Sequence, residues 1–244
     1  MLFPESSALL TLNSQYSVLF LERSLLPENL FGEILFTGLP KLFTPLSTLS
    51  LEVSGIVQTQ NLYGGGYTGK NVILGFLDTG IDYRHPAFLR SNGQSRILSI
   101  WDQTDRTGTP PPQFPYGSLY EKSDLDDALR SRDPLSVVPV TDPDGHGTYV
   151  AGVAGGTPNA SAGFLGAAPE ADFAVVKLKP AKQNLKDFYL VSTNAPVFEE
   201  DDLLSAMRFL NEVAAREGKP LVICLALGTC LLYTSPSPRD ISGS

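Results

Sequence analysis

The chain has 244 residues, of which 42% are hydrophobic and 18% are charged, and its formal net charge is −8. This length and composition predict a globular protein with one large domain, or one large and one small domain. The acidic balance argues against nucleic acid or an anionic membrane as a partner, and no apolar run reaches transmembrane length. The first ten residues lack the basic start and apolar core of a signal peptide, so we expect either that the chain is not secreted by that route or that its native start is missing.

The amino-terminal part is expected to be a small α+β unit, separate from the rest. It covers residues 1–60 and contains strand-like segments at residues 16–22 and 32–36. Residues 61–70 are rich in glycine and indicate a junction. A domain boundary is therefore predicted near residue 60.

Two strands and an insertion are predicted next. The apolar run at residues 71–77 (NVILGFL) is typical of a strand buried on both faces, and residues 96–101 (RILSIW) predict a second strand. Residues 104–142 are rich in proline, serine and aspartate and indicate an insertion. Within it, we expect a short helix at residues 124–130 with Ser123 as its cap.

The second half of the chain alternates helices and strands. A small-residue helix is predicted at residues 146–155, a strand at 171–179, a helix at 201–217 and a strand at 221–227. Gly218 is expected to end the longer helix. Its predicted buried face consists of Leu203, Leu204, Met207, Leu210, Val213 and Ala214. Strands and helices in alternation predict an α/β fold, a parallel sheet with helices on both faces.

Two residues carry the chemistry that this sequence indicates. Asp78 follows the buried strand at the edge where sites of parallel sheets form, and His146 lies between glycines at the start of a helix. A serine nucleophile needs a histidine base, and this base needs an acid that orients its ring. Asp78 and His146 are therefore the candidate orienting acid and general base.

Other interpretations of these residues are structural. Aspartate before a turn commonly caps it, which is the alternative for Asp78 and the interpretation we favour for Asp82, Asp142 and Asp144. A histidine such as His146 can also be a hydrogen-bonded structural residue. The occurrence of both motifs in one chain favours catalysis for Asp78 and His146.

Two ligand sites are considered and rejected. Asp78, Asp82, His85 and His146 are metal-ligand residue types, but their spacing does not favour a metal site, and His85 before a proline indicates a structural loop. Residues 64–70 nearly match a phosphate-binding loop. Because they precede a strand, whereas such a loop follows one, we expect no nucleotide.

Four segments in order resemble the subtilisin-like serine proteases, the subtilases of peptidase family S8. They are residues 67–86, 144–152 (DGHGTYVAG), 163–169 (GFLGAAP) and 225–228 (LALG). The resemblance covers residues 61–229. It implies a polypeptide substrate, with Asp78 as orienting acid and His146 as base. It also implies that Ala226, Leu227 and Gly228 bind the substrate backbone and line the pocket for the residue before the scissile bond.

The nucleophile of the family is not recognisable in this sequence. Subtilases carry their serine in a G-T-S-M-A-x-P motif and use an asparagine in the oxyanion hole, and neither motif occurs here. Ser235 lacks the neighbouring glycine and helix, and it falls in residues 230–244, which we interpret as a non-native tail. We therefore expect an amino-terminal fragment of a protease with little or no activity by itself.

A narrower resemblance concerns the segment that starts at residue 97 (ILSIWDQT). It is most similar to the clostridial Csp spore-germination proteases, which process a spore-cortex lytic enzyme. This resemblance implies that residues 1–60 are a prodomain that can stay bound, and that the protein is spore-associated or intracellular. The alternative function is a non-catalytic sensor or scaffold with the subtilase fold.

No cofactor is implied by the resemblance. Calcium stabilises many subtilases, but Ala87 stands where many of them place an acidic ligand. The usual calcium site is therefore not expected to form in this chain.

Overall fold

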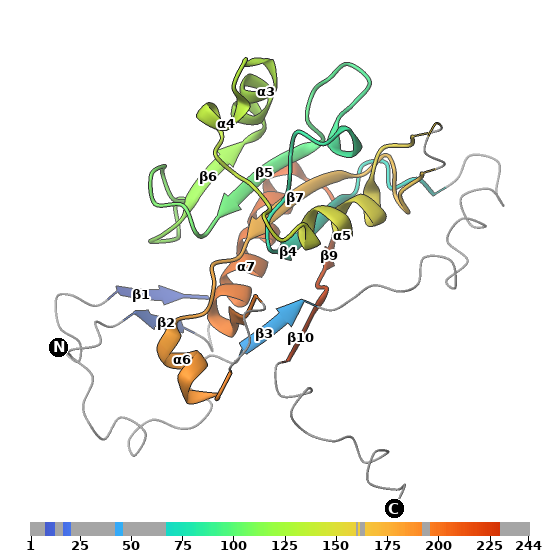
Figure 1. Cartoon of the computed structure of the whole chain (residues 1–244). Helices are drawn as coiled ribbons and strands as arrows, with labels where there is room; N and C mark the ends of the chain where they lie inside the picture. Colours follow the sequence, from blue (N-terminus) through green and yellow to red (C-terminus); the bar gives the residue numbers. More distant parts are fainter. Residues whose placement is uncertain are drawn as a thin grey trace, which may run out of the picture.

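The computed structural model of the protein has a five-stranded sheet at its centre (Figure 1). Helix α5 (His146–Gly155) packs on one face of this sheet and helix α7 (Glu200–Glu217) on the other, as predicted for an α/β fold. The residues that the structure describes are 8–12, 17–20, 42–45, 67–159, 161, 164–191 and 196–229.

The central sheet has the strand order β6-β5-β7-β4-β9. Four of its strands run parallel: β5 (Ile97–Asp102), β7 (Asp172–Lys177), β4 (Ile73–Asp78) and β9 (Leu221–Cys224). The fifth strand, β6 (Ser118–Glu121), pairs antiparallel with β5 and comes from the predicted insertion. The predicted parallel sheet is therefore confirmed for four strands, and the insertion adds one antiparallel strand at its edge.

Strand β4 lies in the middle of the sheet and is buried along its whole length. Its side chains alternate between the two faces, as the pleat of a strand requires. Leu74 and Phe76 belong to the hydrophobic cluster on the α5 side, whereas Ile73 and Leu77 belong to the cluster on the α7 side. This double burial explains the continuous apolar run in the sequence.

Helix α7 begins at Glu200, one residue before the predicted start, and ends at Gly218, which adopts the left-handed conformation with φ of 63°. One residue of its predicted buried face was wrong, because Leu204 is 39% exposed. Phe209 takes part in the packing instead, and Met207 is only partly buried. The buried face is rotated slightly toward Phe209, where Trp101 offers an aromatic contact.

The insertion contains two helices, α3 (Lys122–Arg130) and α4 (Pro134–Val137). The predicted cap at Ser123 was wrong. The Glu121 side chain accepts a hydrogen bond from the third helical residue, and Asp124 accepts one from the backbone N–H of Glu121. Because of this reciprocal capping box, the helix begins at Lys122, two residues earlier than predicted and directly after the last residue of β6.

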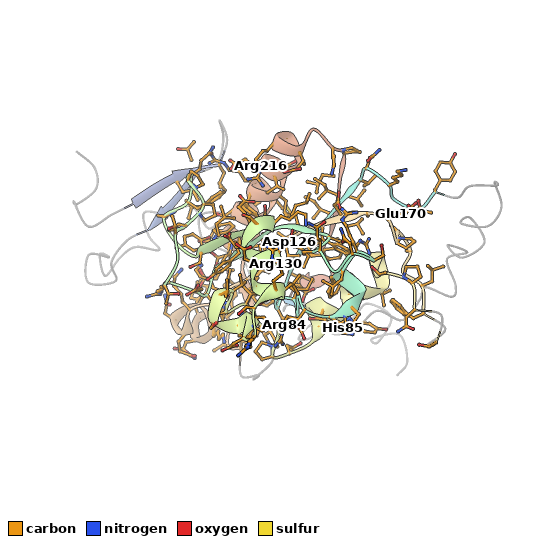
Figure 2. The ribbon with its side chains drawn as sticks, turned by 90° about the horizontal axis from the view of Figure 1, so that it is seen from above. Arg84, His85, Asp126, Arg130, Glu170 and Arg216 are labelled. Carbon is orange, nitrogen blue, oxygen red and sulfur yellow. The ribbon has the colours of Figure 1, made fainter. Side chains whose placement is uncertain are left out.

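Hydrogen bonds of charged side chains connect the insertion to the central sheet and to α7. Two of these side chains, Asp126 and Arg216, are labelled in Figure 2. Arg216 of α7 donates two hydrogen bonds to the Glu121 carboxylate, at 2.7 and 2.9 Å, and a third to the Ser99 hydroxyl at 2.9 Å. Asp126 of α3 accepts the Ser95 backbone N–H at 2.7 Å. The insertion is thus bonded to strand β5 and to α7.

The strand predicted at residues 221–227 is divided in the structure. β9 ends at Cys224, the last residue paired with β4, and the chain then leaves the central sheet. β10 (Leu227–Thr229) lies in a separate three-stranded sheet with β3 (Leu42–Pro45) and β8 (Phe198–Glu199), in the order β10-β3-β8.

Two further strands come from the amino-terminal part. β1 (Ala8–Thr11) and β2 (Ser17–Phe20) form an antiparallel pair, and β2 lies within the strand predicted at residues 16–22. Leu10 is 6% exposed and belongs to the hydrophobic cluster of α7. The strand predicted at residues 32–36 lies outside the described residues.

Two short helices complete the described part, the 3-10 helix η3 (Pro86–Phe88) and α6 (Gln183–Phe188). No helix among the described residues combines the length and the apolar character that a membrane crossing requires.

Candidate active site

Asp78 is the last residue of the central strand and is 2% exposed. The chain must turn sharply behind it, because the next segment passes close to residues of the insertion. Gly80 has a φ of +134°, and a Cβ atom there would lie 2.6 Å from the Thr141 carbonyl oxygen. The glycine after Asp78 and Thr79 is therefore required by both conformation and space.

His146 is the first residue of α5, and glycines on both sides place it there. Gly145 has a φ of 80°, in the left-handed region. Gly147 allows α5 to touch the end of β4, since a Cβ atom there would lie 2.2 Å from the Gly80 carbonyl oxygen and 3.0 Å from Asp78 Cβ. The histidine is thereby held beside the buried aspartate.

The structure brings the two predicted residues into direct contact. His146 Nδ1 lies 2.7 Å from Asp78 Oδ1. The aspartate side chain is 2% exposed and the histidine side chain 16% exposed, so the pair is largely shielded from water. An ionised carboxylate can only accept, so in the tautomer that fits this contact Nδ1 donates its proton to Asp78 and Nε2 is the nitrogen that can act as a base.

Asp142 connects the ends of β4 and α5 by four hydrogen bonds. Its Oδ1 accepts from the Thr79 hydroxyl at 2.7 Å and from the Gly145 N–H at 3.0 Å. Its Oδ2 accepts from the Thr148 N–H at 2.8 Å and from the Thr148 hydroxyl at 2.6 Å. The favoured interpretation of Asp142 as a helix-start residue agrees with these contacts.

Thr79 and Thr148 extend the network that Asp142 begins. Thr79 Oγ1 accepts the Gly147 N–H at 3.1 Å, and Thr148 Oγ1 accepts the Asp82 N–H at 2.9 Å. Sequence reasoning did not single out these threonines, although each follows a candidate catalytic residue closely. Their hydroxyls both accept and donate, so they link the two segments that carry Asp78 and His146.

Burial raises the pKa of Asp78 above its usual value of 3.8. The hydrogen bonds from His146 and from the Thr79 N–H, and the charge of His146, oppose this effect, whereas the nearby Asp142 adds to it. The Asp78 carboxyl group therefore ionises less readily in this site than it would in water.

The candidate substrate-binding residues lie after β9, where the chain leaves the central sheet. Ala226 is 9% and Leu227 7% exposed, and Gly228 is also buried. Leu227 and Gly228 belong to β10, and their backbone pairs with Pro45 and Thr44 of β3. These residues already have an extended peptide segment as a neighbour, taken from the amino-terminal part of the same chain.

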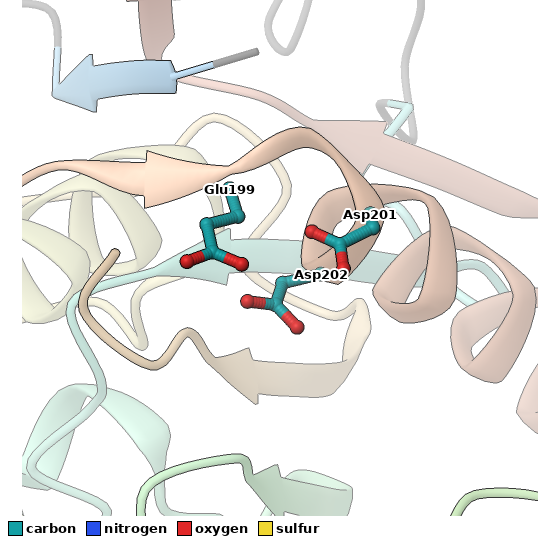
Figure 3. Close-up of side chains that lie close together, drawn as sticks. All are labelled: Glu199, Asp201 and Asp202. Atoms are coloured by element: carbon teal, nitrogen blue, oxygen red, sulfur yellow. The ribbon is translucent and has the colours of Figure 1, made fainter. Parts of the chain in front are cut away.

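In the described part of the chain, one group of acidic residues has a spacing that could suit a metal ion, at the start of α7 (Figure 3). Carboxylate oxygens of Glu199, Asp201 and Asp202 lie within 4.8 Å of one another. Lys182 donates to Glu199 at 2.6 Å, and Lys179 forms an ion pair with Asp202. Two of the three carboxylates are thus already paired with ammonium groups of the chain.

The third carboxylate of this group, Asp201, differs from the other two. Burial and the neighbouring charges of Asp202 and Glu199 raise its pKa to about 6. Its Oδ1 atom is buried and has no hydrogen-bond partner among the residues that the structure describes. Among these three carboxyl groups, Asp201 is therefore the one whose pKa is raised to about 6.

Comparisons with known proteins agree with the resemblance found in the sequence. The model of the subtilase family matches residues 69–242. Among curated proteins, the chain is similar to Subtilisin-like protease SBT2.2 of Arabidopsis thaliana, 31% identical over 132 residues, and to Subtilisin-like protease PopC of Myxococcus xanthus, 33% identical over 113 residues. Each match covers 46% of this chain.

A solved structure, that of the Clostridium perfringens CspB protease, is similar in fold with a TM-score of 0.56 and 33% identity. The match covers 69% of this chain and 30% of that protein. Matches to the two curated relatives span 15% and 17% of their lengths. The chain thus corresponds to a minor part of the length of each of these proteins.

Proposed function

Because the chain belongs to the subtilase family, we propose that Asp78 and His146 are the orienting acid and the general base of a serine endopeptidase. The observation that carries this proposal is the 2.7 Å contact between His146 Nδ1 and the buried Asp78 carboxylate. In this role, Nε2 of His146 takes the proton of the serine hydroxyl as the serine oxygen attacks the peptide carbonyl. It then returns the proton to the leaving amine.

The substrate is a polypeptide that binds as an extended strand. We infer that the substrate backbone lies between β8 and β10, with Ala226, Leu227 and Gly228 on one side. Support comes from the three-stranded order β10-β3-β8, in which β3 takes the central position. An extended peptide adds to strand edges in this way by main-chain hydrogen bonds.

Strand β3 then acts as a stand-in for the substrate, and the amino-terminal part as a prodomain. Two contacts with α7 support this role. Leu10 of β1 is buried in the α7 cluster, and Arg208 of α7 donates a hydrogen bond to the Thr11 carbonyl oxygen. The prodomain is therefore anchored on α7 and reaches the substrate position through β3.

The nucleophile belongs to sequence outside the matched motifs. A G-T-S-M-A-x-P motif does not occur in the 244 residues, so this chain by itself is expected to hydrolyse no peptide at an appreciable rate. As its natural substrate we propose a spore-cortex lytic enzyme. The segment at residues 97–104 and the similarity to the CspB protease support this assignment.

The alternative is a non-catalytic sensor or scaffold. The buried and hydrogen-bonded Asp78–His146 pair favours the enzyme, because a protein that no longer catalyses has no need to keep a desolvated carboxylate against a histidine. One experiment separates the two functions. Peptide hydrolysis is measured for the protein with its full natural coding sequence and for its Asp78→Asn variant.

We expect kcat to fall on the order of 10⁴-fold in the Asp78→Asn variant, because the asparagine no longer holds the histidine in the correct tautomer. The exposed Asp144→Asn variant is the control and should keep its activity. Absence of hydrolysis in the natural protein, or equal activity of the two variants, would contradict the proposal.

A further inference from the structure

A cavity of about 960 Å³ lies beside α5, and its lining includes Ala87, the position that the family resemblance assigns to an acidic calcium ligand. Its lining includes Ala87 and Phe88 of η3, together with Val153 of α5 and Phe164. No carboxylate lines the cavity among the described residues. Calcium prefers six to eight oxygen ligands that include carboxylates, so this mainly apolar lining does not fit the ion.

The guanidinium group of Arg96, directly before β5, supplies a positive charge next to this cavity. Arg96 is 3% exposed. Its Nη1 donates to the Thr157 hydroxyl at 2.9 Å and to the Ala87 carbonyl oxygen at 3.4 Å. Both of these residues line the cavity. Arg96 therefore bonds to two of the residues that line the cavity, from two different segments of the chain.

The remaining donors of Arg96 reach the segment that leads into β7. Nε donates to the Ala171 carbonyl oxygen at 3.1 Å, and Nη2 donates to the same oxygen and to the Ala168 carbonyl oxygen at 3.5 Å. The five contacts use all five N–H groups of a guanidinium. Four oxygen acceptors surround this cation, and oxygen atoms of this kind are also the ligands that calcium binds.

The positive charge of Arg96 has no carboxylate at salt-bridge distance in the part of the chain that the structure describes. Asp172 forms ion pairs with Arg90 and Lys219, and Glu170, labelled in Figure 2, accepts from Thr68. Burial lowers the pKa of Arg96 to about 10, so the group stays charged at neutral pH. Its guanidinium carbon also lies 4.7 Å from the centre of the Phe173 ring.

Three segments distant in the sequence meet at this side chain: η3, the loop after α5 and the loop before β7. Backbone bonds follow the same arrangement. The Thr157 N–H donates to the Ala87 carbonyl oxygen at 2.7 Å, and the Arg96 N–H donates to the Phe88 carbonyl oxygen at 2.8 Å. The Ala87 carbonyl oxygen thus accepts from both the Thr157 N–H and Arg96, and the Ala168 carbonyl oxygen accepts from both the Ala171 N–H and Arg96. The guanidinium therefore links carbonyl oxygens of η3 to those of the loop before β7.

We propose that the Arg96 guanidinium takes the place of a calcium ion beside Ala87. Its hydrogen bonds hold η3, the α5–β7 connection and β5 together in a chain that binds no calcium there. This inference is independent of the peptidase function. It predicts that the thermal stability of the chain does not depend on calcium. It also predicts that this stability depends on the planar guanidinium of Arg96, which donates to several acceptors at once.

The first test uses the unchanged chain. Thermal unfolding is followed by circular dichroism in the presence of a calcium chelator and again in excess calcium chloride. We expect the same midpoint temperature in both solutions. A higher midpoint in calcium would overturn the proposal, because a ligand that binds the folded state raises its stability.

The second test changes the cation. We expect Arg96→Lys to lower the midpoint by roughly 5–10 °C, since lysine keeps the charge but cannot reach four acceptors at once. Calcium should not restore it. The matched control is Arg84→Lys, at an arginine that is 39% exposed and bonds only locally to Asp82. Equal midpoints for the two variants, or recovery in calcium, would overturn the proposal.

A milder change covers the case in which Arg96→Lys does not fold. Thr157→Val removes the hydroxyl that accepts from Arg96 and donates to the Leu89 carbonyl oxygen, with little change of shape. We expect a midpoint lower by roughly 2–5 °C and insensitive to calcium. An unchanged midpoint would contradict the proposal that the hydrogen bonds of Arg96 hold these three segments together.

Discussion

Gly147 and Gly80 touch: a methyl group on Gly147 would lie 2.2 Å from the Gly80 carbonyl oxygen. This close approach allows the first turn of α5 to bring His146 against the end of β4. The contact between acid and base therefore depends on a residue without a side chain.

We expect Gly147→Ala to lower the free energy of unfolding by about 2–4 kcal/mol, because the helix must move away from β4. The movement should also break the His146–Asp78 contact. Urea unfolding measures the first effect, and the loss of the hydrogen-bonded Nδ1–H signal of His146 in proton NMR measures the second.

Gly152→Ala is the control for Gly147→Ala. Gly152 lies in the same helix, and a Cβ atom there would meet nothing within 4 Å. Alanine is the better helix former, so this variant should gain about 0.5–1 kcal/mol of stability. A similar loss for both variants would show that the close approach at Gly147 has no special importance.

Asp142→Ala should destabilise the start of α5. The variant removes the acceptor of four hydrogen bonds from Thr79, Gly145 and Thr148, and a loss of about 2–3 kcal/mol is expected in urea unfolding. The control is Asp144→Ala, two residues away at an exposed position, which should change stability by less than about 0.5 kcal/mol. Equal losses would contradict the positioning role of Asp142.

The pKa of Asp201, raised to about 6, predicts a specific pH dependence. The unfolded chain ionises this carboxyl near 3.8, whereas the folded chain keeps its proton until about pH 6. The unfolded state therefore binds fewer protons between these values, and the free energy of unfolding falls as the pH rises from about 4 to 6.

Asp201→Asn should remove this fall and be more stable than the unchanged chain by about 1–2 kcal/mol at pH 7, with no difference below pH 4. Urea unfolding across this pH range measures the effect. Asp187→Asn, in the short helix α6, is the control and should leave the pH dependence unchanged. If both variants follow the pH curve of the unchanged chain, the raised pKa of Asp201 has no effect on stability.

Thr44→Pro tests the position of β3. Proline removes the backbone N–H in a strand that has neighbours on both sides, so it should weaken the β10-β3-β8 sheet. We expect the amides of Leu227 and Gly228 to exchange with solvent at least about tenfold faster, as measured by hydrogen exchange. Thr44→Ala keeps the N–H and should exchange as the unchanged chain does. Equal exchange in both variants would argue against β3 as the partner of β10.

Much of the central fold follows from local sequence patterns. The apolar run before Asp78 predicted strand β4, and the small-residue segment from His146 predicted α5 with both of its ends. Such patterns are decided within a few residues, because burial on both faces requires apolar side chains and a glycine stops or bends the chain. The error at Ser123 was also local, because Glu121, two residues earlier, forms a capping box with Asp124 and begins the helix instead.

The candidate site was predictable in its residue types and not in its geometry. Asp78 and His146 could be selected because an acid at a strand end and a histidine between glycines form a recognisable pattern. Their 2.7 Å contact depends on Gly147 and on the Asp142 network, which join segments more than sixty residues apart. The division of the strand at residues 221–227 was not predictable either, since both halves are equally apolar.

The sequence by itself determined the family, the order of acid and base, and the two-sided burial of the central sheet, because these are properties of residue types and their order. Only the tertiary structure decided that β3 lies between β8 and β10 and that Arg96 collects the carbonyl oxygens beside Ala87. Both arrangements depend on hydrogen bonds of backbone groups. Because every residue carries such groups, the pattern of side chains in the sequence does not predict which of them meet.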